Sequence, residues 1–254
     1  DAAGRRTLLT LPNGVSAEYV YDLGSRLSAL IYRNALGLLG DLQYSYDSAA
    51  NRTAAGGSFA RTLLPDAVGS ATYDVGNRQL EFRASTMTFD DNGNLATLTD
   101  AGGTTNFIWD ARNRLTMLTG LSMNASFAYD GLGRRSRKTI GGVTTQFHYD
   151  ALDLIREIGG AGDASYLRTL SIDEARARTD AVDTAYYLAD ALGSTIGHTT
   201  PAGASITTYT YEPYGRTAVT GGTLNPLQYT GRENDGTDIY YYRARYYHPS
   251  LGRF

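Results

Sequence analysis

Aromatic–acidic dipeptides recur along the chain and constrain its fold more than any other feature. Eight such pairs occur, and the first seven acids are separated by 25, 27, 16, 20, 20 and 20 residues. Units repeated at such intervals stack on one another, because a single unit cannot bury its own apolar face. The pairs are Tyr21-Asp22, Tyr46-Asp47, Tyr73-Asp74, Phe89-Asp90, Trp109-Asp110, Tyr129-Asp130, Tyr149-Asp150 and Tyr211-Glu212.

A basic residue usually follows the acid by four positions, and Gly or Asn commonly precedes it. Aspartate accepts backbone N–H bonds at turns, and Gly or Asn adopts the left-handed conformation. We therefore predict that each acid holds a turn and pairs with its own Arg, and that these residues are structural. The pairs are Asp22/Arg26, Asp74/Arg78, Asp110/Arg114, Asp130/Arg134 and Glu212/Arg216, with looser Asp47/Arg52 and Asp150/Arg156, Asn94 after Asp90, and Asn51, Asn77, Asn113 or Gly133 before the basic residue.

The residues between the turns alternate with a period of two, which is typical of strands. Val143, Thr145, Phe147 and Tyr149 fall on one face of the expected strand, and His148 falls on the other. A 20-residue unit has room for two strands and two turns. The pattern thus predicts an all-β chain of tandem hairpins. We expect irregular insertions at Gly37–Asp41 and Gly159–Asp163, and a loop over Ser171–Val182.

Composition excludes several classes of protein. Net charge is −3 and no basic run occurs, so we expect no nucleic-acid partner. Cysteine is absent, which excludes disulfides and thiolate metal sites. The apolar stretches are too short for a membrane span, and the N-terminus lacks a signal segment.

Chemical sites are sparse. Asp90–Asn94 resembles the start of a calcium loop, but Ala101 stands where the closing acid would be, so we predict a turn. His148, His198 and His248 lie 50 residues apart, and we expect ordinary exposed histidines. Neither a nucleophile elbow nor a phosphate loop occurs. We therefore expect no catalytic residue, cofactor or metal.

Three segments near the C-terminus give the chain a family resemblance. They are YYLADALGST, TYTYEPYGR and NPLQYTGRENDGTDIYYYRARYYHPSLGRF. Together with the YD units they resemble the RHS/YD-repeat family, which includes bacterial Rhs polymorphic toxins, the cocoon component of insecticidal toxin complexes, and teneurins. Ala191 stands where this family often has His. The residues that match the family's core motif are Gly231, Arg232, Tyr241, Arg245, Tyr246, Tyr247, Pro249, Gly252 and Arg253.

The resemblance implies a β-sheet that spirals into part of a hollow shell. It implies YD repeats over residues 1–158, an irregular connector over 159–185 and the repeat-associated core over 186–254. The implied role is non-enzymatic: a wall around a toxin or other cargo of a secreted or cell-surface parent, with a secretion-system component as a further partner. Relatives cut themselves at an Asp-Pro-x-Gly motif after the core, where Arg253 would support cleavage, and we expect this chain to be a fragment of such a parent.

An alternative function is a surface adhesion or carbohydrate-binding module. Tyrosines cluster at Tyr240–Tyr242 and at Tyr246-Tyr247. Exposed rings could form a flat platform for sugars, whereas strand alternation predicts that most of them pack inside the protein. We expect packing, and keep carbohydrate as the alternative partner.

Overall fold

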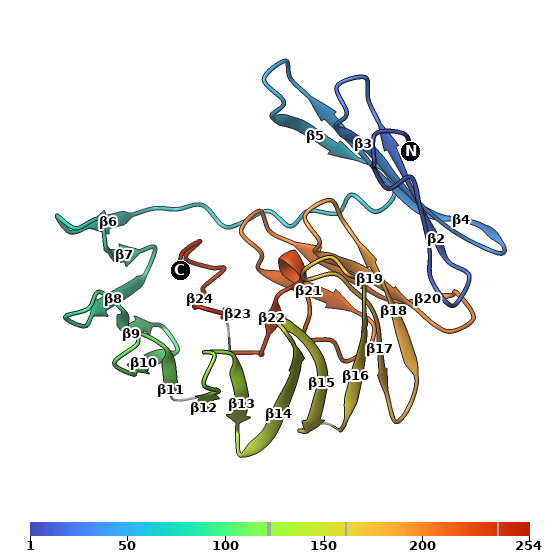
Figure 1. Cartoon of the computed structure of the whole chain (residues 1–254). Coiled ribbons are helices and arrows are strands. Elements are labelled where there is room, and N and C mark those ends of the chain that lie inside the picture. Colours follow the sequence, from blue (N-terminus) through green and yellow to red (C-terminus); the bar gives the residue numbers. More distant parts are fainter. Residues whose placement is uncertain (121–122, 161, 238) are drawn as a thin grey trace. The chain divides into compact units, whose positions relative to one another are not determined.

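The computed structural model describes residues 1–120, 123–160, 162–237 and 239–254. The described chain is built from antiparallel strands, with one short 3₁₀ turn, η1 (Tyr229–Gly231) (Figure 1). Within each sheet, strands that follow one another in sequence are hydrogen-bonded neighbours. The prediction of an all-β fold made from tandem hairpins is therefore confirmed.

Two compact units make up the chain, and each unit combines two separate stretches. Unit 1 contains residues 1–64 and 164–233. Its first stretch forms a five-stranded sheet in sequence order, and strands of the second stretch pair in order as well. The strands are β1 (Leu8–Thr10), β2 (Ser16–Tyr21), β3 (Leu27–Asn34), β4 (Gly37–Tyr46), β5 (Arg52–Gly56), β16 (Ala164–Arg168), β17 (Ala175–Asp180), β18 (Thr184–Ala189), β19 (Thr195–Thr199), β20 (Ser205–Tyr211) and β21 (Thr217–Thr220).

Unit 2 contains residues 65–163 and 234–254. Its first ten strands pair in sequence order, and the C-terminal strands form a small separate sheet. The strands are β6 (Ala71–Tyr73), β7 (Gln79–Phe82), β8 (Ser85–Phe89), β9 (Leu95–Asp100), β10 (Gly103–Trp109), β11 (Leu115–Thr119), β12 (Asn124–Tyr129), β13 (Arg135–Ile140), β14 (Val143–Asp150), β15 (Asp153–Gly159), β22 (Glu233–Asn234), β23 (Tyr240–Tyr242) and β24 (Arg245–Tyr247). The predicted division at residues 158 and 185 concerns repeat identity and stays a prediction.

Most repeat strands end with a break in register at the aromatic residue. In β12 the register shifts between Ala128 and Tyr129, and in β2 it shifts between Val20 and Tyr21. Such β-bulges rotate the side chain that follows them. The same shift occurs before Tyr46, Tyr73, Phe89, Trp109 and Tyr149.

Each unit has its own apolar core. The core of unit 1 includes Leu30, Tyr32 and Leu42 from the N-terminal sheet, together with Leu188 and Ile196. The core of unit 2 joins β8 to β12, part of the β6 to β15 sheet that we call the wall of this unit, to the C-terminal segment. It contains Met87, Leu98, Phe107, Leu115, Leu118, Ala125, Phe127, Ile239, Tyr241 and Tyr246. In both units a late segment of the chain completes a core that an earlier segment began.

The predicted insertion at Gly37–Asp41 is wrong, because these residues belong to β4. A Cβ atom on Gly40 would lie 2.5 Å from the Phe59 ring. The glycine that suggested a loop therefore makes room for an aromatic side chain. The insertion expected at Gly159–Asp163 includes residue 161, which lies outside the described residues.

The predicted loop over Ser171–Val182 is also wrong in its second half, where β17 forms. Arg176 and Arg178 fall within the predicted loop, yet both side chains are buried. Arg178 pairs with Asp180 at 2.5 Å, and Arg176 pairs with Glu174. Local ion pairs allow these charged residues to occupy a buried strand.

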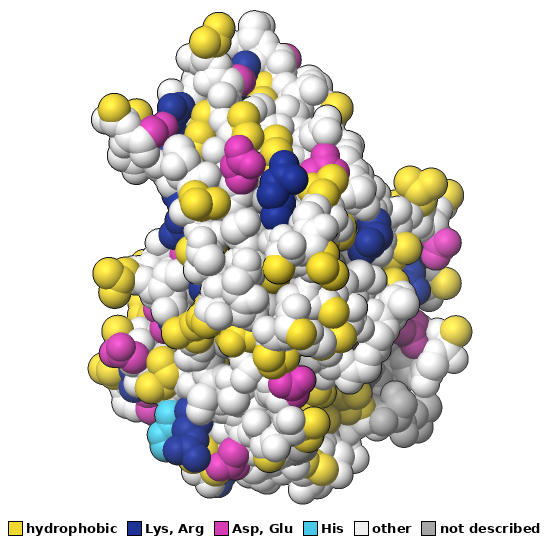
Figure 2. Space-filling model, turned by 90° about the vertical axis from the view of Figure 1, so that its right-hand side faces the viewer, with side chains coloured by type: hydrophobic (Ala, Val, Ile, Leu, Met, Phe, Trp, Pro, Cys, Tyr) yellow, Lys and Arg dark blue, Asp and Glu magenta, His cyan; other side chains and the backbone are white. Residues whose placement is uncertain are grey.

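Figure 2 shows one face of the molecule, on which hydrophobic, basic and acidic side chains are interspersed. Several exposed apolar residues stand at the tips of turns, including Leu23, Val75, Leu132 and Leu192. Single exposed apolar residues of this kind are ordinary at protein surfaces. In the described part of the chain, no helix is long and apolar enough to cross a membrane.

Candidate functional site

The repeating unit of the site is a five-residue turn, which we call the YD turn. It runs from the acid to the residue four positions later, which we call the closing residue. In the Asp130 turn, carboxylate Oδ1 accepts the backbone N–H groups of Leu132 and Arg134, each at 2.9 Å. Oδ2 accepts Nε of Arg134 at 2.7 Å. Gly133, just before the closing residue, has φ 82°.

The same geometry recurs in the other predicted turns. Nε of the closing Arg donates to the acid at 2.7 Å for Asp22, 2.6 Å for Asp74 and 2.8 Å for Asp110. The residue before it has a positive φ, at Ser25, Asn77 and Asn113. In the Glu212 turn the Arg216 guanidinium lies 3.2 Å from the carboxylate.

These hydrogen bonds lower the pKa of Asp22, Asp74 and Asp130. For Asp22, and likewise for Asp74, the backbone N–H of the closing Arg is the largest cause, followed among the favourable contacts by its side chain. For Asp130, burial acts to raise the pKa, but bonds from Arg134 outweigh it and the pKa falls. The acids are thus held as carboxylates and cannot act as proton donors near neutral pH.

Two turns depart from the expected pairs. Asp47 bonds the side chain of Asn51 at 2.9 Å, and Ala50 takes the left-handed position that we had assigned to Asn51. Arg52 instead lies over the Tyr44 ring, 5.1 Å from its centre. Asp150 lies within β14 opposite Asp153, and Arg156 pairs with Asp163. The Asp47 turn thus keeps its five-residue length, with Asn51 and not Arg52 as its closing residue.

Several closing residues also reach the next repeat. Arg26 lies over the Tyr46 ring at 4.9 Å, and the Tyr46 hydroxyl donates to the carbonyl of Leu27 at 2.7 Å. We call this pair of contacts the repeat lock. It also joins Arg5 to Tyr21, Arg114 to Tyr129 and Arg134 to Tyr149.

The hydrogen bond of the lock survives where the closing residue is not Arg. Trp109 Nε1 donates to the carbonyl of Leu95, which follows the closing Asn94, at 2.8 Å. The Tyr211 hydroxyl donates to the carbonyl of Thr195, which follows Ser194, at 2.6 Å. Sequence reasoning identified the aromatic and the acid but missed that neighbouring repeats are joined through them.

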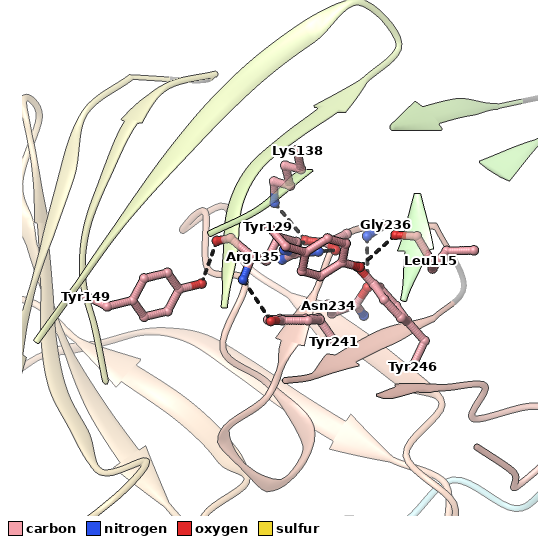
Figure 3. A network of polar contacts seen from close by, with 10 residues as sticks. Leu115, Tyr129, Arg135, Lys138, Tyr149, Asn234, Gly236, Tyr241 and Tyr246 are labelled. Carbon is pink, nitrogen blue, oxygen red and sulfur yellow. Dashed lines mark hydrogen bonds and ion pairs between the residues drawn. The ribbon is translucent and has the colours of Figure 1, made fainter. Parts of the chain in front are cut away.

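A buried ion-pair network attaches the C-terminal sheet to the wall of unit 2 (Figure 3). Asp235 and Arg135 are paired and both side chains are fully buried, and Lys138 bonds the same carboxylate at 2.8 Å. Burial acts to raise the pKa of Asp235, but Arg135 and Lys138 outweigh it and the pKa is lowered. The Tyr241 hydroxyl accepts the backbone N–H of Arg135 at 2.9 Å.

A second attachment lies in unit 1 and uses backbone groups. Thr195 donates its N–H to the Gln228 carbonyl at 3.1 Å and its hydroxyl to the Leu227 carbonyl at 2.6 Å. The N–H of Thr230 donates to the Ser194 hydroxyl at 3.0 Å. Of the predicted core motif, Gly231 has φ 69°, and Arg232 pairs with Asp173 at 2.5 Å.

The rest of the core motif packs within unit 2. Tyr240, Tyr241, Tyr246 and Tyr247 are all buried, and the Tyr246 hydroxyl lies 3.0 Å from that of Tyr129. These rings give the adhesion alternative no exposed platform. Arg245 stacks on Phe254 at 4.1 Å, while Pro249 is buried and Gly252 has φ 65°.

Arg253 makes a contact that resembles the repeat lock. Its guanidinium lies 4.9 Å from the centre of the Tyr73 ring. Its Nη1 donates to the Asn77 carbonyl at 3.4 Å. Tyr73 belongs to β6, the last strand in the pairing order. Arg253 therefore covers the ring with a guanidinium, as closing residues do in the other repeats.

The expectation of three exposed histidines is wrong for His198. His148 is exposed and His248 is half-buried, whereas His198 is fully buried between the rings of Tyr187 and Tyr209. Burial lowers its pKa to about 3. The predicted Asp90 turn forms with Asn94. Within the described residues, no three His, Asp or Glu side chains are grouped so as to hold a metal.

Comparison with known proteins gives one family and several solved structures. The Teneurin YD-shell model matches residues 9–254. The chain is similar to the Photorhabdus luminescens Tc holotoxin pore with a mutated TccC3, at 18% identity and a TM-score of 0.68. It is also similar to TcdB2-TccC3 without its hypervariable C-terminal region, at 20% identity and a TM-score of 0.69.

These matches cover 99% of this chain but only 17% of each solved chain. At such identities they show the fold alone. Among curated proteins none matches the chain.

Proposed function

This chain belongs to the teneurin YD-shell family, and from that premise we propose that it is a wall segment of a shell enclosing a toxin or other cargo of its parent protein. The family match confirms the resemblance drawn from the sequence. The observation that carries the proposal is the repeat lock, which bonds several repeats to their neighbours. The parent is a secreted or cell-surface protein, and a secretion-system component is its further partner.

Exclusion is the mechanism of such a wall. Neighbouring strands of a sheet lie ~4.8 Å apart and satisfy one another's backbone groups. A protease needs an extended segment of its substrate, and a paired sheet leaves no opening for one. Ten consecutive strands of unit 2 pair in this way, from β6 to β15.

The lock adds what strand pairing alone does not provide. A β-ladder bonds adjacent strands, whereas the lock bonds the turns at their ends. The Arg134 guanidinium stacks on the Tyr149 ring, and its Nη1 also donates to the Ala151 carbonyl at 2.6 Å. Because cation–π contacts and charge-assisted bonds resist sliding, the wall edge stays closed where a sheet would otherwise fray.

The test is protease protection of the cargo in the full-length parent. We expect the sequence that follows Phe254 in the parent to be digested at least tenfold more slowly than the same sequence expressed alone. Mass spectrometry of timed digests measures both rates. Equal rates would sink the encapsulation proposal.

A matched pair of variants links protection to this chain. Arg135→Ala removes the buried partner of Asp235 and should release the C-terminal sheet, so that the cargo is digested faster. Arg137→Ala, two residues away and exposed, should leave protection unchanged. Equal protection in both variants would show that the attachment of β22–β24 does not close the wall.

A further inference from the structure

A cavity of about 400 Å³ lies inside unit 2, between the wall and the C-terminal segment. Residues from β7 to β10 and their turns form one side, and residues from Ile239 to Phe254 form the other. In Figure 1 the C-terminal segment lies beside these strands. Small-molecule sites have volumes of roughly 300–1,000 Å³, so the cavity is large enough for a small ligand.

The body of the cavity is apolar and rich in aromatic rings. It is lined by Met87, Leu95, Ile239 and Leu251, and by the aromatic side chains of Phe89, Phe107, Trp109 and Tyr246. Phe107 and Met87 are buried members of the core of this unit. Aromatic walls of this kind favour a flat apolar ligand, which can stack on them or meet them edge to face.

The charged side chains of the lining are all basic. Arg112, Arg245 and Arg253 line the cavity, and the described residues that line it include neither Asp nor Glu. The nearby acids Asp90 and Asp110 already bond their closing residues. Arg112 is exposed, so its charge lies at the mouth. An anionic group fits there, and a cationic group does not.

One residue of the lining carries a polar atom without a partner. Gln79 is only 2% exposed, and its side-chain oxygen has no hydrogen-bond partner among the described residues. A buried acceptor left unpaired destabilises the folded state. A ligand hydroxyl would supply the missing donor.

We propose that this cavity binds a small aromatic carboxylate that carries a hydroxyl group. The ring packs among the aromatic walls, the carboxylate lies against Arg112 and Arg245, and the hydroxyl donates to Gln79. This site does not depend on the shell function, and it requires only that unit 2 folds.

The only tryptophan of the chain, Trp109, lines the cavity and reports binding directly. We would titrate the protein with 4-hydroxyphenylacetate, phenylacetate and tyramine and follow Trp fluorescence. The first should bind at least tenfold more tightly than tyramine, which replaces the carboxylate by an amine, and about threefold or more tighter than phenylacetate, which lacks the hydroxyl. Failure of the hydroxy acid to bind, or equal binding of all three compounds, would overturn the proposal.

Two variants with a control test the named residues. Arg112→Gln should weaken 4-hydroxyphenylacetate at least fivefold, while the exposed Arg137→Gln in the same unit, which does not line the cavity, should not. Gln79→Leu should abolish the preference for the hydroxy acid over phenylacetate and leave the fold intact. Unchanged affinity in Arg112→Gln, or a preserved preference in Gln79→Leu, would place the ligand elsewhere.

Discussion

The Asp130 turn of unit 2 and the Asp190 turn of unit 1 share a backbone but differ in what they hold. In both, the acid Oδ1 accepts the N–H groups two and four residues later, at 2.8–2.9 Å. The closing residue is Arg134 in the first turn and Ser194 in the second. Arg134 stacks on the next repeat, whereas Ser194 bonds Thr230 of the core segment.

The surroundings of the two acids differ accordingly. The Asp190 turn is packed against the N-terminal sheet, where the Tyr44 hydroxyl accepts the N–H of Ala191 at 3.2 Å. Burial raises the pKa of Asp190, whereas the pKa of Asp130 is lowered. The acid therefore fixes the turn, while the closing residue selects its partner. Arg134 contacts the next repeat, whereas the small Ser194 leaves space for Thr230 of the core segment.

We expect the largest loss of stability when Ser194 is replaced by Arg. Ser194 is fully buried, so Ser194→Arg places a charge and a long side chain where Thr230 docks. We expect the free energy of unfolding of unit 1 to fall by about 3 kcal/mol or more. Urea unfolding followed by hydrogen exchange of unit 1 peptides measures it.

The control is Asn94→Arg in unit 2, which introduces the same residue at an equivalent, half-buried closing position. It should be neutral or slightly stabilising. Comparable losses in both variants would show that the identity of the closing residue does not select the partner.

The residues that lie eight positions after the two acids, Lys138 and His198, give a test at different pH values. Lys138 is paired with Asp235, while the equivalent His198 is buried and its pKa is lowered to about 3. Below pH 6.5 the unfolded chain takes up a proton that the folded unit refuses. Stability should therefore fall as pH drops from 6.5 towards 3, by about 2 kcal/mol at pH 5.

His198→Phe should remove this part of the pH dependence, because Phe preserves the ring contacts with Tyr187 and Tyr209 and cannot be protonated. Urea midpoints at pH 7 and pH 5 provide the measurement for both proteins. A variant as acid-sensitive as the parent would exclude His198 as the cause.

Two variants test the hydrogen bond of the repeat lock by removing or adding one tyrosine hydroxyl. Tyr149→Phe removes the bond to the Arg135 carbonyl and should cost about 1 kcal/mol. Phe89 is the natural counterpart without a hydroxyl, beneath Arg78. Phe89→Tyr should add the bond to the Gln79 carbonyl and stabilise unit 2 slightly; thermal unfolding that moves in the same direction for both variants would contradict the lock.

We expect the smallest change in stability from replacing the turn acids themselves. Asp130→Asn should lower stability at pH 7 by about 0.5 kcal/mol, as for other exposed pairs. Asp190→Asn should leave it unchanged or raise it. Stability from Asp130 is present above its unfolded pKa and lost on acidification, whereas the burial cost of Asp190 disappears as pH falls through its raised pKa. Chemical unfolding from pH 7 down to about pH 2.5, below the ordinary aspartate pKa of about 3.9, tests the opposite slopes, and parallel slopes would refute them.

The sequence predicted the parts of the structure whose partners lie within five residues. The Asp110 turn needs only its own Arg114 and Asn113, so the spacing of residue types reveals it. Strand alternation placed Phe147 inside and His148 outside for the same reason.

Long-range partners could not be predicted in this way. Arg135 and Asp235 are 100 residues apart, and nothing local marks either residue as buried. The burial of Arg178 in β17 depends on the neighbouring strands β16 and β18. His198 follows a polar turn, and its burial depends on strands on both sides. In each case the deciding energy comes from a contact that exists only in the folded chain.

The discontinuous make-up of unit 1 has a consequence for how the protein is made. Its N-terminal stretch ends at residue 64 and its second stretch begins at residue 164. A ribosome adding roughly 5–20 residues per second takes about 5–20 s to cover that interval. Until the second stretch has been synthesised, the apolar side chains of β3 and β4 lack their core partners Leu188 and Ile196. The speed of translation between these two points thus sets how long the apolar side chains of β3 and β4 are exposed to neighbouring nascent chains on a polysome.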